Sequence, residues 1–371
     1  MQAKTNITIE VFFELVRAGL WEQGIRLADY GQIDYPALQE LAEEQAVVGL
    51  IAAGMEHVTD IKIPKQDLLQ FIGQTLQIEE QNKAMNYFIG VLVDKMREAG
   101  IYTLLVKGQG VAQCYERPLW RSSGDVDFYL SDTNYLAAKE FLTPLAAHVD
   151  EEDKQRSHYS MTIDPWIVEL HGTLYSGFSR RIDRGLDEVH KDIFYGGNVR
   201  SWMDENVQVF LPSANNDVII IFTHIIQHFY VGGIGLRQIC DWCRLLWTYR
   251  DSLNNGLLES RIRKMGLMTE WKAFASLAVE RLGMPEEAMP FYKSSKEYRR
   301  KSRRILDLII HTGTFGHNQD QSYRTKYPTL VQKTITLWHR IGEFYKLTMI
   351  FPCNAPKFFV SYVFNRVKVS L

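Results

Sequence analysis

The first hundred residues carry apolar positions at helical spacing. Over residues 36–58 this spacing predicts one helix, with Pro36 suited to its first turn. Residues 64–100 read as one long helix, either continuous or broken along its length, with Gly100 as its C-terminal stop. We therefore expect a helical region over residues 1–100.

Short β-rich segments replace this pattern from residue 101. We expect a helix that starts at Asp132 and runs to 146 between them. The expected strands are "IYTLLVK" (101–107), "VDFYL" (126–130), "HYSMTID" (158–164) and "WIVELHG" (166–172). Helical spacing returns after Pro212. The pattern predicts an α+β fold, in which a small mixed core over 101–212 lies between helical regions over 1–100 and 213–371.

Composition narrows the classes of function. The chain has 371 residues, of which 46% are hydrophobic and 23% charged, as in ordinary globular proteins. Its net charge of −2 gives no global sign of a nucleic-acid partner. Four cysteines are too few for a disulfide framework, and Cys240 and Cys243 lack the second pair that a zinc site needs. No apolar run reaches the ~18 residues of a membrane span, and no signal peptide is evident, so we expect a reduced, cytoplasmic protein.

Two acidic residues stand one apart where the strand 126–130 begins. Asp125 and Asp127 point to the same face of a strand, and two carboxylates so close need a cation. Oxygen ligands favour Mg²⁺ or Mn²⁺. Glu169 shares a strand face with His171, and it completes a three-carboxylate cluster if its strand lies beside the first. Such a cluster is the layout for two-metal phosphoryl or nucleotidyl transfer.

The segment before the acidic pair offers positive charge and a turn. Lys107 ends a strand, Gly108 permits a tight turn, and a helix beginning near Gln109 would bind phosphate through free N–H groups. Arg121 adds charge for a polyphosphate. The same glycines form a broken G-x-G-x-x-G, but Pro118 shortens the following helix, which argues against a dinucleotide fold. The absence of G-x-x-x-x-G-K-[ST] excludes a P-loop.

A D-x-D pair alone leaves other interpretations open. Metal-dependent sugar transferases use D-x-D with Mn²⁺ to bind a nucleotide diphosphate, and Gly124-Asp125 could simply form a turn. The Lys-Gly pair before the acids and the E-x-H strand after them favour a metal site over the turn.

Three segments together resemble the uncharacterised nucleotidyltransferase family of the polymerase-beta-like superfamily. They are "LLVKGQGVAQCYERPLWRSSGDVDFYL", "VELHG" and "HIIQHFYVGGIGLRQICDW", which carry K-G, R-x-x-G-D-[IV]-D and [DE]-x-H in that order. The usual Gly-Ser is Gly108-Gln109 here. The resemblance implies a polymerase-beta-like sheet and Mg²⁺-dependent transfer of a nucleoside monophosphate from an NTP, with pyrophosphate release. The acceptor is open: a small molecule, a sugar, a protein or a nucleic acid.

The resemblance also implies roles for individual residues. It makes Asp125, Asp127 and Glu169 the metal ligands and catalytic carboxylates. Whether Glu169 acts as a base or only as a metal ligand stays open. The nucleotide and phosphate binders would be Lys107, Gly108, Gln109, Arg121 and Gly124. A degenerate fold that binds nucleotides for regulation, without turnover, is the alternative from another class.

Further residues could support the site. His224 and His228 share a helix face, as core residues or beside the substrate, with His171 in a similar supporting position. Arg237 and Asp241 could form a helical ion pair, or their helix could face the nucleotide. The basic run 293–304 is typical of a solvated helix face or of a patch for an anionic acceptor. We expect the aromatic C-terminal segment 344–371 to pack on the helices rather than on a membrane.

Overall fold

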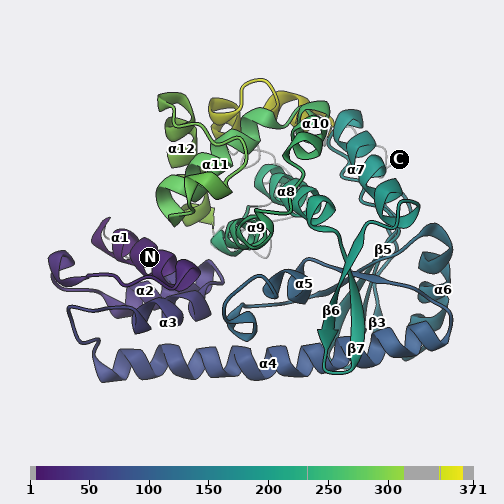
Figure 1. Ribbon diagram of the computed structural model, residues 1–371, viewed down its shortest axis with the longest axis horizontal. Helices are drawn as coiled ribbons and strands as arrows, with labels where there is room; N and C mark the ends of the chain where they lie inside the picture. The colour runs from purple at the N-terminus through teal and green to yellow at the C-terminus, as the bar shows by residue number, and fades with distance from the viewer. Residues whose placement is uncertain (1–5, 232, 313–341, 343, 362–371) are drawn as a thin grey trace, which may run out of the picture.

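The computed structural model describes residues 6–231, 233–312, 342 and 344–361. A single helix, α4 (Lys65–Glu98), runs along one edge of the molecule, beneath the N-terminal helices at one end and the sheet at the other (Figure 1). Its 34 residues span about 51 Å. Gly100 follows it with φ 76°, a conformation that favours glycine. The predicted long helix ending at Gly100 is confirmed.

The segment 36–58 forms two helices rather than the single one expected. They are α2 (Tyr35–Glu44) and α3 (Val48–Glu56), and both pack with α1 (Asn6–Trp21). The chain leaves the helical conformation at Ala46, where φ is 54°. Gln45 is fully buried there, and its side chain donates to the carbonyl of Ile309 at 3.2 Å and accepts from the N–H of Leu236 at 3.0 Å. The break therefore serves contacts with distant segments that helical spacing cannot reveal.

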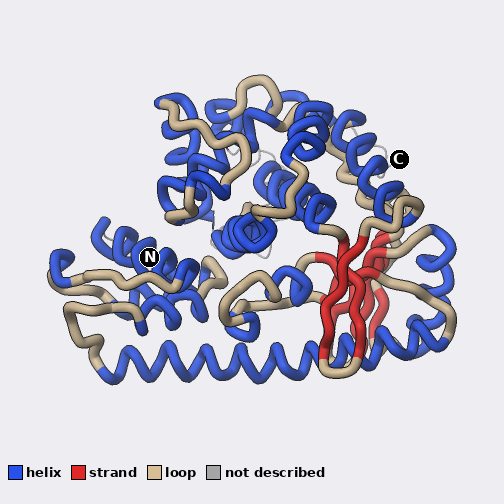
Figure 2. The backbone as a smooth tube through the Cα atoms, in the orientation of Figure 1, coloured by secondary structure: helices blue, strands red, loops and turns tan. Residues whose placement is uncertain are grey.

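A mixed five-stranded sheet forms the centre of the α/β part (Figure 2). Its order is β1-β2-β5-β4-β3, with β2 and β5 parallel and the other neighbours antiparallel. The strands are β1 (Leu104–Val106), β2 (Val126–Tyr129), β3 (His148–Val149), β4 (His158–Ile163) and β5 (Trp166–His171). The predicted α+β class with a small mixed sheet is confirmed.

Some elements had no clear signal in the sequence. The pattern did not indicate β3, the helix α7 (Arg180–Phe194), or the separate hairpin of β6 (Val199–Asp204) and β7 (Val207–Pro212). The helix α6 (Asp132–Leu142) is shorter than expected, and Ser131, not Asp132, occupies its N-cap position. Short turns of helix are α5 (Gly108–Ala112) and the 3₁₀ segments Ala28–Tyr30, Pro118–Trp120, Thr143–Leu145 and Glu286–Ala288.

The pleat of the sheet separates an apolar face from a polar one. Val126, Phe128, Val168 and Leu170 are buried in one cluster with the apolar side chains of α4 and α6. The alternate residues of β2 and β5 point away from that cluster. This opposite face is where the charged residues of the sheet meet the C-terminal helices.

The C-terminal helices and the N-terminal helices share one hydrophobic cluster. Trp242, Trp271, Phe222 and Phe274 lie at its centre and are fully buried. The helices that follow the sheet are α8 (Ala214–Val231), α9 (Leu236–Tyr249), α10 (Asn255–Met265), α11 (Met268–Leu282) and α12 (Lys296–Thr312). None of the described helices is long and apolar enough to cross a membrane.

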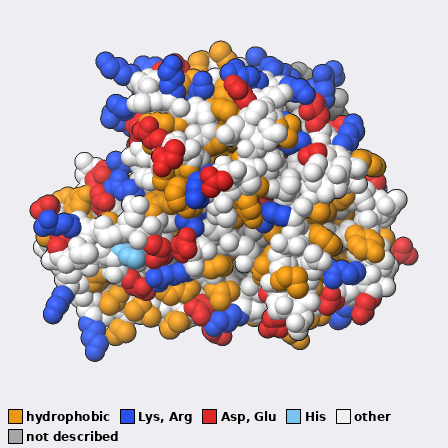
Figure 3. All heavy atoms as spheres, viewed as in Figure 1, with side chains coloured by type: hydrophobic (Ala, Val, Ile, Leu, Met, Phe, Trp, Pro, Cys, Tyr) orange, Lys and Arg blue, Asp and Glu red, His pale blue; other side chains and the backbone are white. Residues whose placement is uncertain are grey.

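The described part of the C-terminal segment packs on these helices, as expected, while residues 362–371 lie outside the described residues. Phe351 and Phe358 are buried in the shared cluster. Lys301 of the basic run donates to the carbonyl of Ile350 at 2.6 Å, and Arg304 donates to that of Met349 at 2.7 Å. Lys and Arg side chains line the upper edge of the face in Figure 3, and charges of both signs are mixed elsewhere on it. Part of the basic run therefore anchors the C-terminal segment.

Candidate active site

Strand pairing brings the predicted carboxylates to one place. Asp127 of β2 and Glu169 of β5 are direct partners across the parallel pair. Asp125 immediately precedes β2, and all three line one cavity of about 480 Å³. The cavity lies between the polar face of the sheet and the helices α8 and α9. The contact on which the three-carboxylate prediction depends is therefore present.

Asp127 is the most deeply buried of the three carboxylates. Its Oδ1 lies 2.8 Å from Lys107 Nζ and 2.8 Å from His171 Nε2. Burial alone would raise the pKa of Asp127, but the charge of Lys107 and the hydrogen bond from His171 lower it below its usual range. Lys107 reaches this carboxylate because its neighbour Val106 pairs with Asp127 across β1 and β2. The carboxylate is thus held ionised inside the cavity.

Glu169 and Asp125 have opposite electrostatic environments. Glu169 Oε2 lies 3.2 Å from His158 Nε2 and 3.4 Å from His171 Nε2. Burial opposes ionisation of Glu169, but these two imidazoles outweigh it and lower its pKa. Asp125 is exposed by surface area, but partial desolvation and then the charges of Asp127 and Glu169 raise its pKa. A divalent cation among these oxygens would relieve that repulsion. Among the described residues, however, the group whose possible ligand atoms all lie within 4.8 Å of one another is His158, Glu169 and His171, not the three carboxylates.

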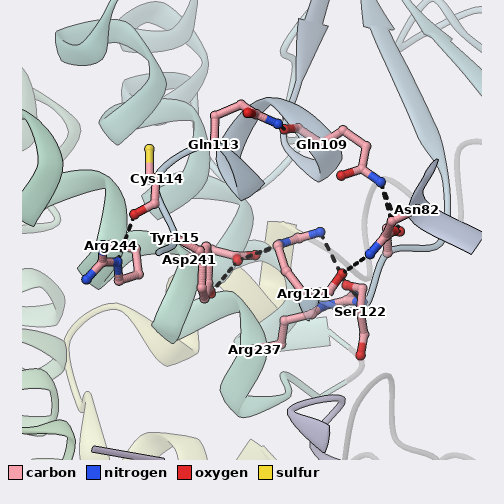
Figure 4. A network of polar contacts seen from close by, with 11 residues as sticks. Asn82, Gln109, Gln113, Cys114, Tyr115, Arg121, Ser122, Arg237, Asp241 and Arg244 are labelled. Carbon is pink, nitrogen blue, oxygen red and sulfur yellow. Dashed lines mark hydrogen bonds and ion pairs between the residues drawn. The ribbon is translucent and has the colours of Figure 1, made fainter. Parts of the chain in front are cut away.

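The loop that carries Asp125 is clamped between two helices (Figure 4). Arg121 donates to both oxygens of Asp241 on α9, through Nε and Nη2, at 2.7 Å each. Tyr115 donates to Asp241 Oδ1 at 2.8 Å. From α4, Asn82 donates to the carbonyl of Arg121 at 2.8 Å, and its Oδ1 accepts from Gln109 Nε2 at 2.8 Å.

These contacts bear on two of the predicted phosphate binders. Arg121 lines the cavity, but its guanidinium group is already bound to the carboxylate of Asp241. Gln109 is buried and faces Asn82 rather than the cavity. Gly108 and Gly124 do line the cavity, although α5 after Gly108 has only five residues. Arg121 and Gln109 therefore position the loop.

Arg237 also lines the cavity, and it makes fewer hydrogen bonds to the described residues around it than Arg121 does. Its Nη1 donates to the carbonyl of Ser122 at 2.9 Å, while its Nε is buried with no hydrogen-bond partner in the described structure. Burial and then the charge of Arg121 lower the pKa of Arg237. The helical ion pair with Asp241 is not formed, since Asp241 binds Arg121. The side chains of Gln45 and Gln238 bond the first N–H groups of α9, so this helix end is not open to a nucleotide.

The wall of the cavity formed by α8 is largely apolar and carries two imidazoles. His224 and His228 of α8 pack with ring centroids 4.3 Å apart. Burial lowers the pKa of His228 to about 4 and that of His224 well below its usual value, so both rings are neutral at pH 7. Ile221, Leu174 and Leu186 also line the cavity. Uncharged side chains therefore form part of its lining.

Sequence reasoning missed His158 and Arg156, which also line the cavity. A signal for His158 existed. The two expected strands 158–164 and 166–172 are joined by a turn at Asp164, so a tight antiparallel hairpin places His158 opposite His171. Arg156 lies in an irregular segment before β4, where no periodic pattern gives its direction.

Comparison with known proteins identifies the family of this chain. A family model described as an uncharacterised nucleotidyltransferase matches residues 31–283, more than half of the chain. No curated protein and no solved structure matches the chain. The match includes α2 to α11 and so includes every strand of the sheet, which supports nucleotidyl transfer as the general activity. The chain belongs to the uncharacterised nucleotidyltransferase family.

Proposed function

We propose that this protein transfers a nucleoside monophosphate from an NTP to a hydroxyl group of an acceptor. The observation that carries the proposal is the pairing of Asp127 with Glu169, with Asp125 and Lys107 at the same cavity. Paired carboxylates next to a buried lysine are the parts that a metal-dependent polyphosphate reaction needs.

Asp125, Asp127 and Glu169 would hold Mg²⁺ or Mn²⁺. When bound, the metal supplies positive charge that neutralises the charge developing on the transferred phosphoryl group. We assign Glu169 as a ligand because it is the direct strand partner of Asp127 across β2 and β5.

Two cations of the cavity would bind the polyphosphate. Lys107 contacts Asp127 in the structure, and its flexible ammonium would be able to bind a phosphate oxygen instead if a metal neutralised that carboxylate. Arg237 has an unpaired Nε and lies near the acids. Arg121 stays with Asp241 and holds the loop of Asp125.

The reaction balances without a further reactant. The acceptor hydroxyl oxygen forms a bond to the α-phosphorus, and the bond from that phosphorus to the bridging oxygen breaks. The electron pair leaves with pyrophosphate, and the hydroxyl proton passes to the medium. Fixed cations around the polyphosphate favour this step by stabilising the leaving group.

Nucleotide binding tests the proposal before the acceptor is known. Melting temperatures would be measured with each NTP and with nucleotide sugars, with Mg²⁺, Mn²⁺ or EDTA. A ligand at ~100 times its Kd adds about 2.7 kcal/mol, a readily measured shift. The variants are Asp127→Asn and, as control, Asp150→Asn, whose side chain is 59% exposed at the end of β3 and outside the cavity lining.

We expect a metal-dependent shift with an NTP in the wild type and in Asp150→Asn, and none in Asp127→Asn. Each shift is taken relative to the same variant without ligand, because Asp127→Asn also removes the partner of Lys107. Pyrophosphate release, followed by ³¹P NMR with candidate acceptors, then tests turnover. A shift with nucleotide sugars alone would indicate a sugar transferase, and a shift without turnover would indicate a degenerate fold.

A further inference from the structure

Two histidines, His158 and His171, lie beside Glu169, and a metal site made of the three carboxylates alone gives them no role. The donor atoms of His158, Glu169 and His171 all lie within 4.8 Å of one another. His158 and His171 are direct partners across β4 and β5, and their rings lie 4.9 Å apart by centroid. Both Nε2 atoms are close to the same oxygen of Glu169.

The spacing of these donors matches a shared ion. A tetrahedral zinc site with ligand bonds of about 2.0–2.1 Å has donors about 3.3–3.4 Å apart. The two nitrogen–oxygen distances to Glu169 Oε2 are 3.2 Å and 3.4 Å. Asp127 Oδ1, which is 2.8 Å from His171 Nε2, stands next to the group as a further oxygen donor. The remaining positions open into the cavity, because all of these residues line it.

The ligand chemistry distinguishes this group from an ordinary magnesium site. Mg²⁺ prefers oxygen ligands and keeps its waters, whereas imidazole nitrogen suits Zn²⁺ and related transition metals. We propose that His158, Glu169 and His171 form a transition-metal site that binds Zn²⁺ more tightly than Mn²⁺, and Mg²⁺ least. This site lies next to the oxygen pair of Asp125 and Asp127, so the cavity would hold two different metals at adjacent sites.

This inference deepens the proposed function and rests on it for the role of the second ion. When bound, that ion supplies positive charge beside the polyphosphate. Binding itself needs no nucleotide, and it is therefore tested separately from activity.

Co²⁺ absorption reports the coordination geometry of the site, and pulsed EPR of Mn²⁺ detects nitrogen ligands through their nuclear modulation. EDTA-treated, dialysed full-length protein would be titrated with Co²⁺, with Zn²⁺ in competition, and then with Mn²⁺ and Mg²⁺. We expect one Co²⁺ per chain with visible bands of imidazole ligation, displaced by Zn²⁺ and not by Mg²⁺. Loss of a ligand in His158→Gln should weaken Co²⁺ binding by tenfold or more, since even loss of an outer contact to a metal ligand costs roughly 10–100-fold.

A second histidine of the same sheet provides the matched control. His148 on β3 is exposed and lies outside the cavity lining, so His148→Gln should bind Co²⁺ as the wild type does. His158→Glu replaces a nitrogen donor with oxygen and should shift the preference toward Mg²⁺. Circular dichroism and melting temperature establish that each variant is folded; His158 is 32% exposed, which favours tolerance.

Two results would overturn the inference. One is unchanged Co²⁺ binding in folded His158→Gln, and the other is binding without nitrogen ligation in the wild type. If nucleotide binding with Mg²⁺ persists in either case, the proposed function stands without this site. If the transition metal binds as described and no nucleotide does, the site stands and the proposed function fails.

Discussion

Replacing Asp241 with asparagine should destabilise the fold more than it affects binding. Arg121 and Asp241 side chains are each 6% exposed, and Asp241 accepts hydrogen bonds from both Arg121 and Tyr115. Asparagine can keep part of this geometry but removes the negative charge. Arg121 cannot lose its own charge, so Asp241→Asn leaves a buried cation unpaired. Breaking one side of a buried ion pair costs about 3–5 kcal/mol.

A more exposed pair, in which an arginine also makes two hydrogen bonds to one carboxylate, serves as the control. Arg117 also donates to both oxygens of one carboxylate, Glu56, at 2.8 Å and 2.7 Å, but Glu56 is 51% exposed. Water screens that pair, and Glu56→Gln should cost at most about 1 kcal/mol. Both carboxylates accept two hydrogen bonds from one arginine, and the two pairs differ strongly in burial.

Urea unfolding, followed by circular dichroism, measures both costs. The double variant Arg121→Met/Asp241→Leu should lose less than the sum of its single variants, because it leaves no unpaired charge. The reasoning fails if Asp241→Asn unfolds at the wild-type urea concentration and instead weakens nucleotide binding. That result would return Arg121 to the set of phosphate binders.

Two further predictions concern parts of the fold outside the cavity. A Cβ at Gly54 would overlap the backbone of Leu15, so Gly54→Ala should lower the free energy of unfolding by about 1–3 kcal/mol. Gly73→Ala on α4 meets no neighbour and should raise it by up to about 1 kcal/mol in the same urea assay. Burial raises the pKa of Glu270, so the folded state binds its proton more tightly than the unfolded state does. As the pH falls from the raised pKa of Glu270 toward about 4.5, the wild type should therefore become more stable relative to Glu270→Gln. A difference in melting temperature between the two proteins that does not change with pH would contradict this prediction.

The sequence predicted best where one local pattern decides the outcome. The long helix over 64–100 needed only helical spacing and Gly100 as its end. The convergence of Asp127 and Glu169 depended on the pairing of two strands, which the sequence left as a condition and which the structure shows. Such features depend on few residues that are close in sequence or constrained by chemistry.

Features that depend on distant partners could not be predicted in this way. The residues around Gln45 give no sign that its side chain will accept a hydrogen bond from Leu236. That contact lies at the break between α2 and α3. Arg121 looked like a phosphate ligand because its partner, Asp241, comes 120 residues later. A motif gives the residue type, but the fold decides which charge that residue meets.

The pairing of Lys107 with Asp127 explains how a cavity of acids is stable before any cation arrives. Burial alone would lower the pKa of Lys107, yet the charge of Asp127 raises it, so the ammonium is retained. It occupies a position beside Asp127 Oδ1 where a divalent ion would otherwise neutralise the carboxylate. Asp125 has no such partner among the described ion pairs, and its pKa is raised. On the proposed function, a divalent cation held by these carboxylates would offset the repulsion at Asp125 and would leave Lys107 available to a polyphosphate.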